Sequence, residues 1–318
     1  MKKTISDKID AITAMPPEKC SVTPPMPKSC KIEITANCNL KCSFCATSHG
    51  LREKGKMDFG FYSEVLLPQL KEAGVEEVGM FFLGESTVLK DLPRYIAEAK
   101  YQGFPYIFLT TNGTALTPSK IESYMQAGLD SLKFSMNYAN AEQFADISGV
   151  KPALFLKMIG AIKEAHRIRE RGGYDCGLYA SYIEYTDEQG EKMQELVEKM
   201  RPYLDEIYGL PLYSQADLVG EENELRGWKV SGGNPGRAAN PRPAVPCWSL
   251  FGEARVAFDG ELSMCCFNAD HRFDAGNLNE MSFVDAWHSN RFQALRAKHL
   301  TGDVRGTECE GCISYDKE

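Results

Sequence analysis

Strand-like and helix-like segments alternate along most of the sequence, and this alternation restricts the fold more than any other feature. Apolar runs rich in β-branched and aromatic residues predict six strands, at residues 30–35, 76–84, 105–113, 131–137, 176–186 and 206–214. Amphipathic segments between them predict helices at residues 61–74, 92–103, 119–128, 153–173 and 188–205. Such β/α repeats are typical of a parallel sheet covered by helices, so the sequence predicts an α/β fold.

Composition and charge exclude several classes of protein. The 318 residues carry a net charge of −8 and show no basic patch, so we expect no nucleic-acid partner. No apolar run reaches the roughly 18 residues that indicate a membrane span, so we expect no membrane partner. The first residues lack the apolar core of a secretory signal, so we expect a cytoplasmic protein. The sequence has no Gly-x-Gly-x-x-Gly motif after a strand and no Gly-x4-Gly-Lys-Ser/Thr motif, so the usual signals of a nucleotide phosphate loop are missing.

The chain has 11 cysteines, and three of them fall within the motif CNLKCSFC, as Cys38, Cys42 and Cys45. A reducing compartment disfavours disulfides, so metal binding or catalysis is the better hypothesis. Three thiolates leave one iron of a [4Fe–4S] cube open for another ligand. The motif follows the first strand, where β/α barrels place their chemistry. A zinc site completed by Cys30 or His49 is the alternative.

This spacing, Cys-x3-Cys-x2-Cys, resembles the signature of the radical S-adenosylmethionine (SAM) enzymes. The resemblance implies a [4Fe–4S] cluster on the three cysteines, with SAM bound to the fourth iron. Reductive cleavage of SAM then gives a 5′-deoxyadenosyl radical that abstracts hydrogen from the substrate. It also implies a partial (β/α)6 barrel of the TIM type over residues 29–216. Residues 1–28, which are polar and rich in proline, predict an extended N-terminal lead-in.

Further residues match positions near SAM in this family. They are Phe44 before the third cysteine, Gly84 and Glu85 after the second strand, Thr111 and Asn112 after the third, and Ser135 ending the fourth. The resemblance places Phe44 near the adenine, Glu85 near the methionine amino group and Ser135 near the carboxylate. The family often has Gly-Gly-Glu-Pro where this chain has Leu-Gly-Glu-Ser. Taken alone, a Thr-Asn-Gly segment is usually a turn.

Residues 217–246 are rich in Gly and Pro and predict a linker. Beyond it, Asp259-Gly260 predicts a hairpin turn between two short strands. Residues 282–302 are amphipathic and predict a helix that ends at Gly302.

The C-terminal cysteines resemble the auxiliary-cluster region of the SPASM and twitch radical SAM enzymes. Their spacing fits the twitch form, in which a small C-terminal domain, here residues 247–318, holds one [4Fe–4S] cluster. The implied ligands are Cys247, Cys265, Cys309 and Cys312. Four thiolates close a cube, so the expected role is electron transfer, although four thiolates also suit zinc. Cys266 is either a small buried neighbour or a thiol hydrogen donor.

By cysteine spacing, the chain is most similar to the twitch-type amino-cyclitol dehydrogenases. The resemblance implies oxidation of a secondary alcohol of a small sugar or cyclitol-like molecule, with the auxiliary cluster accepting the second electron. A flavodoxin or ferredoxin would supply electrons. The alternatives are epimerisation of a sugar or peptide with a cysteine hydrogen donor, and thioether-type peptide modification. A short lead-in favours a small molecule over a peptide. A non-catalytic iron–sulfur or zinc protein is the hypothesis from another class.

Overall fold

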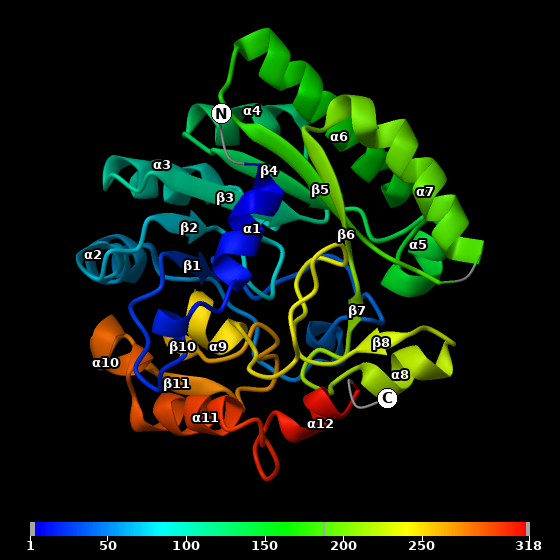
Figure 1. Cartoon of the computed structure of the whole chain (residues 1–318). Coiled ribbons are helices and arrows are strands. Elements are labelled where there is room, and N and C mark those ends of the chain that lie inside the picture. Colours follow the sequence, from blue (N-terminus) through cyan, green and yellow to red (C-terminus); the bar gives the residue numbers. More distant parts are fainter. Residues whose placement is uncertain (1–3, 187, 316–318) are drawn as a thin grey trace.

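The computed structural model describes residues 4–186 and 188–315 and contains the six predicted strands in the predicted order. They are β1 (Ser29–Ile32), β2 (Glu77–Gly79), β3 (Tyr106–Thr111), β4 (Ser131–Ser135), β5 (Gly177–Ile183) and β6 (Glu206–Leu210). Each strand pairs in parallel with the next along the chain (Figure 1). The carboxyl ends of all six therefore lie at one edge of the sheet, and the prediction of a parallel α/β fold is confirmed.

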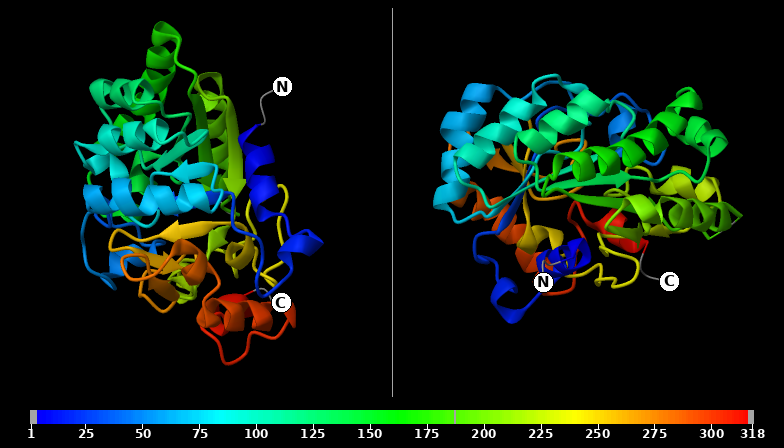
Figure 2. Two further views of the ribbon diagram at one scale, coloured as in Figure 1. Left: turned by 90° about the vertical axis from the view of Figure 1, so that its left-hand side faces the viewer. Right: turned by 90° about the horizontal axis from the view of Figure 1, so that it is seen from above.

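Helices cover the outer face of this sheet (Figure 2). The predicted ones are α2 (Leu67–Glu72, after a π-helical segment Phe61–Leu66), α3 (Leu92–Tyr101), α4 (Pro118–Gln126), α6 (Ala153–Gly172) and α7 (Glu188–Met200). A further helix, α5 (Ala141–Ser148), is too short for the apolar periodicity to predict it. Its start is capped by the Asn140 side chain, which accepts hydrogen bonds from the backbone N–H groups of Glu142 and Gln143.

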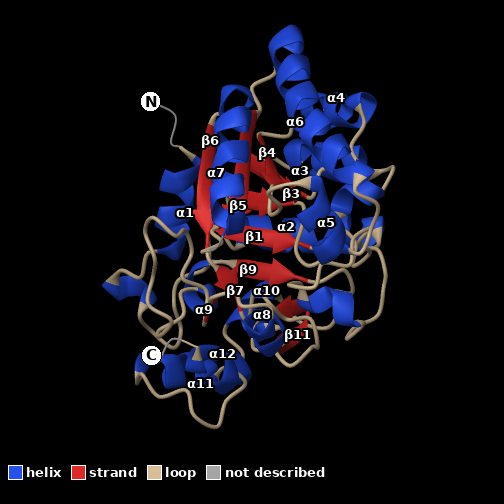
Figure 3. Ribbon diagram, turned by 90° about the vertical axis from the view of Figure 1, so that its right-hand side faces the viewer, coloured by secondary structure: helices blue, strands red, loops and turns tan. Residues whose placement is uncertain are grey.

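The sheet continues past β1 into the C-terminal region (Figure 3). β9 (Ala254–Val256) pairs in parallel with β1, and β10 (Glu261–Ser263) and β11 (Asp274–Asn277) add two antiparallel strands. The turn between β9 and β10 contains Asp259 and Gly260, as predicted, and Gly260 has a φ of 93°. The strand order in the described part of the chain is β11-β10-β9-β1-β2-β3-β4-β5-β6. The C-terminal region therefore extends the barrel sheet.

The prediction of an extended lead-in is wrong over part of its length, because Ile5–Thr13 form helix α1. This helix crosses the inner face of the sheet (Figure 2). Thr4 caps this helix: its hydroxyl oxygen accepts a hydrogen bond from Asp7 N, and the Asp7 carboxylate accepts one from Thr4 N. This reciprocal capping satisfies two otherwise unpaired donors. Apolar residues at positions 5, 9 and 12 share one helix face, and that spacing is the signal for the helix.

The predicted linker is mostly irregular, but it contains α8 (Gly220–Leu225) and β8 (Val230–Ser231), which pairs with β7 (Leu212–Tyr213). Four helices follow: α9 (Ser249–Gly252), α10 (Phe283–Trp287), α11 (Asn290–Leu300) and α12 (Glu310–Ser314). The helix predicted over 282–302 is divided, because Ser289 caps α11 as a new helix. Short 3-10 turns span Pro17–Lys19, Ala46–His49, Ser86–Val88 and Arg201–Tyr203. No helix among the described residues is long and apolar enough to cross a membrane.

Candidate functional site

The three cysteines of the first motif lie on the loop that follows β1. Cys42 Sγ is 2.8 Å from the Tyr138 hydroxyl, and Cys45 Sγ is 3.0 Å from Thr47 Oγ1. Burial raises the pKa of Cys42, and the nearby thiols of Cys45 and Cys38 raise that pKa further. The three sulfurs are therefore close enough to influence one another, and metal binding would displace their protons.

Helix α5 supports this loop through backbone hydrogen bonds. Lys41 N donates to Ser148 O at 3.0 Å, and Ser43 N donates to Ile147 O at 2.9 Å. The helix that periodicity does not predict is thus the element against which the cysteine loop folds.

Gly84, after β2, lies against the start of the cysteine loop. A Cβ atom at this position would be 1.9 Å from the carbonyl oxygen of Thr35, so no residue with a side chain fits without a backbone shift. The next residue, Glu85, donates its N–H to Asn37 O at 2.8 Å. Glycine is thus required here for the close approach of two backbone segments.

The Glu85 carboxylate is buried, with 4% of the residue exposed. Its Oε1 accepts hydrogen bonds from Thr87 N at 3.1 Å and Thr111 Oγ1 at 2.8 Å, and its Oε2 accepts one from Asn112 N at 2.6 Å. Burial raises the pKa of Glu85, and these donors oppose the rise. Glu85 has no ion-pair partner among the residues that the structure describes, although its charge is close enough to raise the pKa of Cys38.

The other residues predicted to lie near SAM gather at the same edge of the sheet. Asn112 Nδ2 donates to Asn39 Oδ1 on the cysteine loop at 3.0 Å. Phe44 is buried and stacks on Tyr138 with 5.9 Å between ring centroids. Ser135 is half-buried at the carboxyl end of β4.

The cysteines of the second motif line one cavity. Its wall includes Cys247, Cys265, Cys266, Cys309 and Cys312. These five come from three segments: the residues before α9, the residues after β10, and the start of α12. Among the described residues, no three His, Cys, Asp or Glu side chains are close enough to hold a single metal ion. The thiols surround a space instead of meeting at a point.

His299 on α11 lines this auxiliary cavity and is a residue that sequence reasoning missed. Its Nδ1 accepts a hydrogen bond from Cys247 N at 3.2 Å, which places the ring hydrogen on Nε2. Nε2 is buried and has no hydrogen-bond partner among the described residues. Burial also lowers the pKa of His299 to about 4, so the imidazole is neutral at pH 7.

A turn after β7 connects the two cysteine sets, and sequence reasoning missed it as well. Gln215 accepts a hydrogen bond from Ala46 N at 2.9 Å and donates one to Phe44 O at 2.7 Å, both on the first cysteine loop. The preceding residue, Ser214, donates its hydroxyl to Cys312 Sγ at 3.4 Å. Gln215 has a φ of 51°, in the left-handed region that non-glycine residues rarely adopt. The turn holds both loops in a fixed relation.

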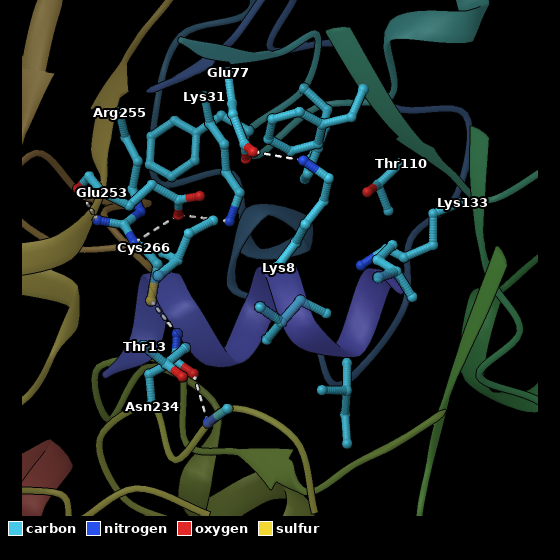
Figure 4. A pocket seen from close by; sticks show the side chains of 18 of the residues that line it. Lys8, Thr13, Lys31, Glu77, Thr110, Lys133, Asn234, Glu253, Arg255 and Cys266 are labelled. Carbon is cyan, nitrogen blue, oxygen red and sulfur yellow. Dashed lines mark hydrogen bonds and ion pairs between the residues drawn. The ribbon is translucent and has the colours of Figure 1, made fainter. Parts of the chain in front are cut away.

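A larger cavity, of about 250 Å³, lies between the inner face of the sheet and helix α1 (Figure 4). Phe82 lines it from the segment after β2, and Thr110 and Lys133 line it from β3 and β4. These residues come one or two positions before Gly84, Thr111 and Ser135. Asn234, Cys266 and Phe267 line both this cavity and the auxiliary cavity. The central cavity therefore extends from the residues below the first cysteine loop to the wall of the second cysteine site.

Three of the four cations that line the central cavity make ion pairs. Lys8 pairs with Glu77 at 2.7 Å. Glu253 is shared by Lys31 at 2.8 Å and Arg255 at 3.0 Å.

Lys133 lines the same cavity but differs from these pairs. Its ammonium donates to the hydroxyl of Tyr208 at 2.9 Å and makes no ion pair within the described residues. Burial lowers the pKa of Lys133 to about 8, and the charge of Glu253 opposes this shift.

The remaining cysteines and His49 lie outside both sites. Cys30 and Cys176 are buried in the core, and Cys20 is exposed. His49 Nε2 is 3.7 Å from the Glu222 carboxylate at the surface.

Comparison with known families assigns this arrangement to a class. A family model described as the radical SAM superfamily matches residues 32–209, and a second, described as an iron-sulfur cluster-binding domain (SPASM), matches residues 247–313. The first match covers more than half of the chain. The chain therefore belongs to the radical SAM superfamily and carries a SPASM iron–sulfur region.

The individual relatives described here share a quarter or less of their aligned residues with this chain. The chain is 23% identical to a tungsten-containing aldehyde ferredoxin oxidoreductase cofactor-modifying protein of Pyrococcus furiosus, over 90% of this chain and 87% of that protein. It is 25% identical to a PqqA peptide cyclase of Xanthomonas campestris, over 91% and 80%. Two solved structures share the fold. BtrN in complex with AdoMet and 2-DOIA has a TM-score of 0.58 at 17% identity, covering 90% of this chain and 92% of that one. Streptococcus suis SuiB bound to S-adenosylmethionine has 0.65 at 18%, covering 86% and 68%.

The residues present fit the groups that this family binds. Beside the first cysteine loop lies a buried carboxylate, Glu85, that has no cation partner among the described residues and could receive an ammonium group. In the auxiliary cavity, the unpaired Nε2–H of His299 is a buried donor among thiols, and sulfur atoms of iron–sulfur clusters accept such hydrogen bonds.

Replacement of Gly84 by alanine should destabilise the protein by about 1–3 kcal/mol, because the new Cβ overlaps the carbonyl oxygen of Thr35 and displaces the cysteine loop. Chemical denaturation measures the change. Gly160→Ala on the exposed face of α6 is the control: no atom lies within 4 Å of the added Cβ, and alanine favours the helix. Equal stability of both variants would contradict the account.

The free energy of unfolding should rise with pH between about 8 and 10.5 because of Lys133. In this window the unfolded chain holds a proton on this lysine that the folded protein has released. The full effect is on the order of 3 kcal/mol, since each pKa unit corresponds to about 1.4 kcal/mol. Denaturation at several pH values should show a steeper rise for the wild type than for Lys133→Met. Because Tyr208 and Glu253, which face Lys133, remain in the variant, parallel curves would contradict this prediction.

Proposed function

We propose that this radical SAM protein is an oxidoreductase that oxidises a secondary alcohol of a small sugar or cyclitol-like molecule. The observation that supports this proposal is the position of the central cavity between the two cysteine sets. On one side its wall includes Phe82, Thr110 and Lys133, which lie within two residues of predicted SAM-site positions. On the other side it shares Cys266, Asn234 and Phe267 with the wall of the auxiliary cavity. A substrate there would lie between a site of hydrogen abstraction and a site that can accept an electron.

In this proposal, Cys38, Cys42 and Cys45 hold the cluster that binds SAM, and Glu85 receives the SAM amino group. The auxiliary [4Fe–4S] cluster is held by Cys247, Cys265, Cys309 and Cys312. When bound, these groups supply a 5′-deoxyadenosyl radical and an acceptor for the second electron.

The chain itself encloses the reaction. Ile5, Ile9 and Ile12 of α1 form the apolar wall opposite the strands and exclude water from the cavity. Conversion of an alcohol to a ketone removes a hydrogen atom, a proton and an electron from the substrate. A base must take the proton, and a flavodoxin or ferredoxin is the expected source of the low-potential electron for SAM cleavage.

The names of the relatives leave two other reactions open. The PqqA peptide cyclase acts on a peptide, and SuiB has been solved with the precursor peptide SuiA, so peptide modification is an alternative. Epimerisation is favoured by one specific observation: the Cys266 thiol lies on the wall of the central cavity, with Asn234 Nδ2 donating to its sulfur at 3.2 Å. A thiol there could return a hydrogen atom to a substrate radical.

Reconstituted protein should contain about eight irons and eight sulfides, as two [4Fe–4S] clusters require. It should release 5′-deoxyadenosine from SAM when dithionite is added. Replacing Cys309 and Cys312 together with alanine should remove about half of the iron, whereas Cys20→Ala, a change at the surface, should remove none. Elemental analysis and chromatography measure these quantities. Bound zinc in place of iron, with no 5′-deoxyadenosine, would contradict the proposal.

Oxidation and epimerisation differ in their use of solvent hydrogen. In deuterated water, a dehydrogenase product should gain no carbon-bound deuterium, and Cys266→Ala should retain most of the activity. Mass spectrometry of the product measures both. Deuterium in a product of unchanged oxidation level, lost in Cys266→Ala but kept in the core variant Cys176→Ala, would show epimerisation.

A further inference from the structure

We propose that the central cavity binds a substrate with an anionic group, a carboxylate or a phosphate, and that Lys133 on β4 is the cation that receives it. This inference rests on the proposed function, because it concerns the substrate of the same site. It names a substrate class that the cysteine motifs do not indicate.

The first observation that supports an anionic substrate is the charge balance of the cavity wall. Four cations line the cavity, Lys8, Lys31, Lys133 and Arg255, against two carboxylates, Glu77 and Glu253. This wall therefore has an excess of positive charge in a chain whose net charge is −8. The three paired cations are held by carboxylates within 3.0 Å. Among the residues that the structure describes, Lys133 is the cavity cation whose hydrogen-bond partner is neutral.

The second observation is the set of hydrogen-bonding groups around Lys133. Its ammonium points into the cavity from the middle of β4 (Figure 4), and the Tyr208 hydroxyl oxygen accepts one of its three hydrogens at 2.9 Å. Thr110, its register partner on β3, lines the same wall and presents a hydroxyl. An ammonium held in a cavity away from bulk water is costly when no carboxylate pairs with it, and an anionic ligand would offset that cost. Two ammonium hydrogens and two neighbouring hydroxyls form a suitable set of donors for it.

The third observation is the position of Lys133 relative to the predicted SAM site. Lys133 and Ser135 are two residues apart on β4, so both side chains lie on the same face of the sheet, separated by roughly 7 Å along the strand. Ser135 ends the strand at the edge where SAM is expected. An anion on Lys133 would therefore fix the substrate below SAM. Cys266 and the Glu253 ion pairs lie at the other side of the cavity (Figure 4), which leaves room for the neutral part of the molecule between them.

Inorganic phosphate and acetate are the probes, and they are titrated into the anaerobic, reconstituted protein with SAM bound. The readout is the thermal unfolding midpoint at constant ionic strength. Wild type should be stabilised by at least one anion, and Lys133→Met should bind that anion at least about tenfold more weakly, a loss of about 1.4 kcal/mol. A response to phosphate alone indicates a phosphoryl group in the substrate, and a response to acetate alone indicates a carboxylate. A response to both supports the shared chemistry.

Lys163→Met is the matched control. Lys163 lies 5.4 Å from the ring centroid of Tyr203, much as Lys133 lies 5.5 Å from that of Tyr208, but it is exposed on the outer helix α6. This variant should respond to anions like the wild type, which corrects for the general stabilisation that phosphate gives proteins. Lys133→Gln repeats the test if the methionine variant does not fold.

The inference is overturned if wild type, Lys133→Met and Lys163→Met respond equally to both anions, or if none of them responds. It is also overturned if Lys133→Met weakens SAM binding and leaves the anion response unchanged, since Lys133 would then bind the SAM carboxylate. No reductant is present, so this result does not depend on SAM cleavage. Absence of 5′-deoxyadenosine formation in the wild type would instead refute the proposed function.

Discussion

The parallel pairing of β1 with β9 is the constraint on which the arrangement of both cysteine sets depends. Cys30 is aligned with Ala254 in this pairing. β1 runs toward the loop that carries Cys38, whereas β10 runs back from the hairpin turn and brings Cys265 toward the opposite edge of the sheet. Because β1 and β10 run in opposite directions on either side of β9, they carry the two cysteine sets toward opposite edges of the sheet, with the inner-face cavity between those edges.

Two smaller features fix the position of the first cysteine loop relative to its surroundings. Gly84 lets the end of β2 approach the backbone at Thr35, directly before the first cysteine loop. The turn at Gln215 binds that loop with its side chain, while neighbouring Ser214 contacts Cys312. The left-handed backbone of Gln215 carries a local conformational cost, which packing on both sides must offset. Both features act on the relative position of the two sites and have no direct part in the chemistry.

The order and parallel arrangement of β1–β6 could be predicted, because buried parallel strands are continuous apolar runs and the covering helices are amphipathic. The apolar periodicity of helices α1 and α5 is a weaker signal, because helices of nine and eight residues show only two or three apolar repeats. Their capping residues, Thr4 and Asn140, are the signals that sequence reasoning overlooked. The division of the helix at Ser289 has the same cause, since one serine is both a tolerable helix residue and a good cap.

By itself, the sequence determined the α/β class, the grouping of cysteines along the chain and the acidic balance of the chain, because these depend on residue type and spacing. Only the tertiary structure decided that the C-terminal strands extend the barrel sheet and that α1 closes its inner face. It also decided that Lys133 is the cavity cation that meets no carboxylate in the described part of the chain. Strand pairing and ion pairing join residues far apart in the chain, and local patterns carry no record of which distant partner each residue meets.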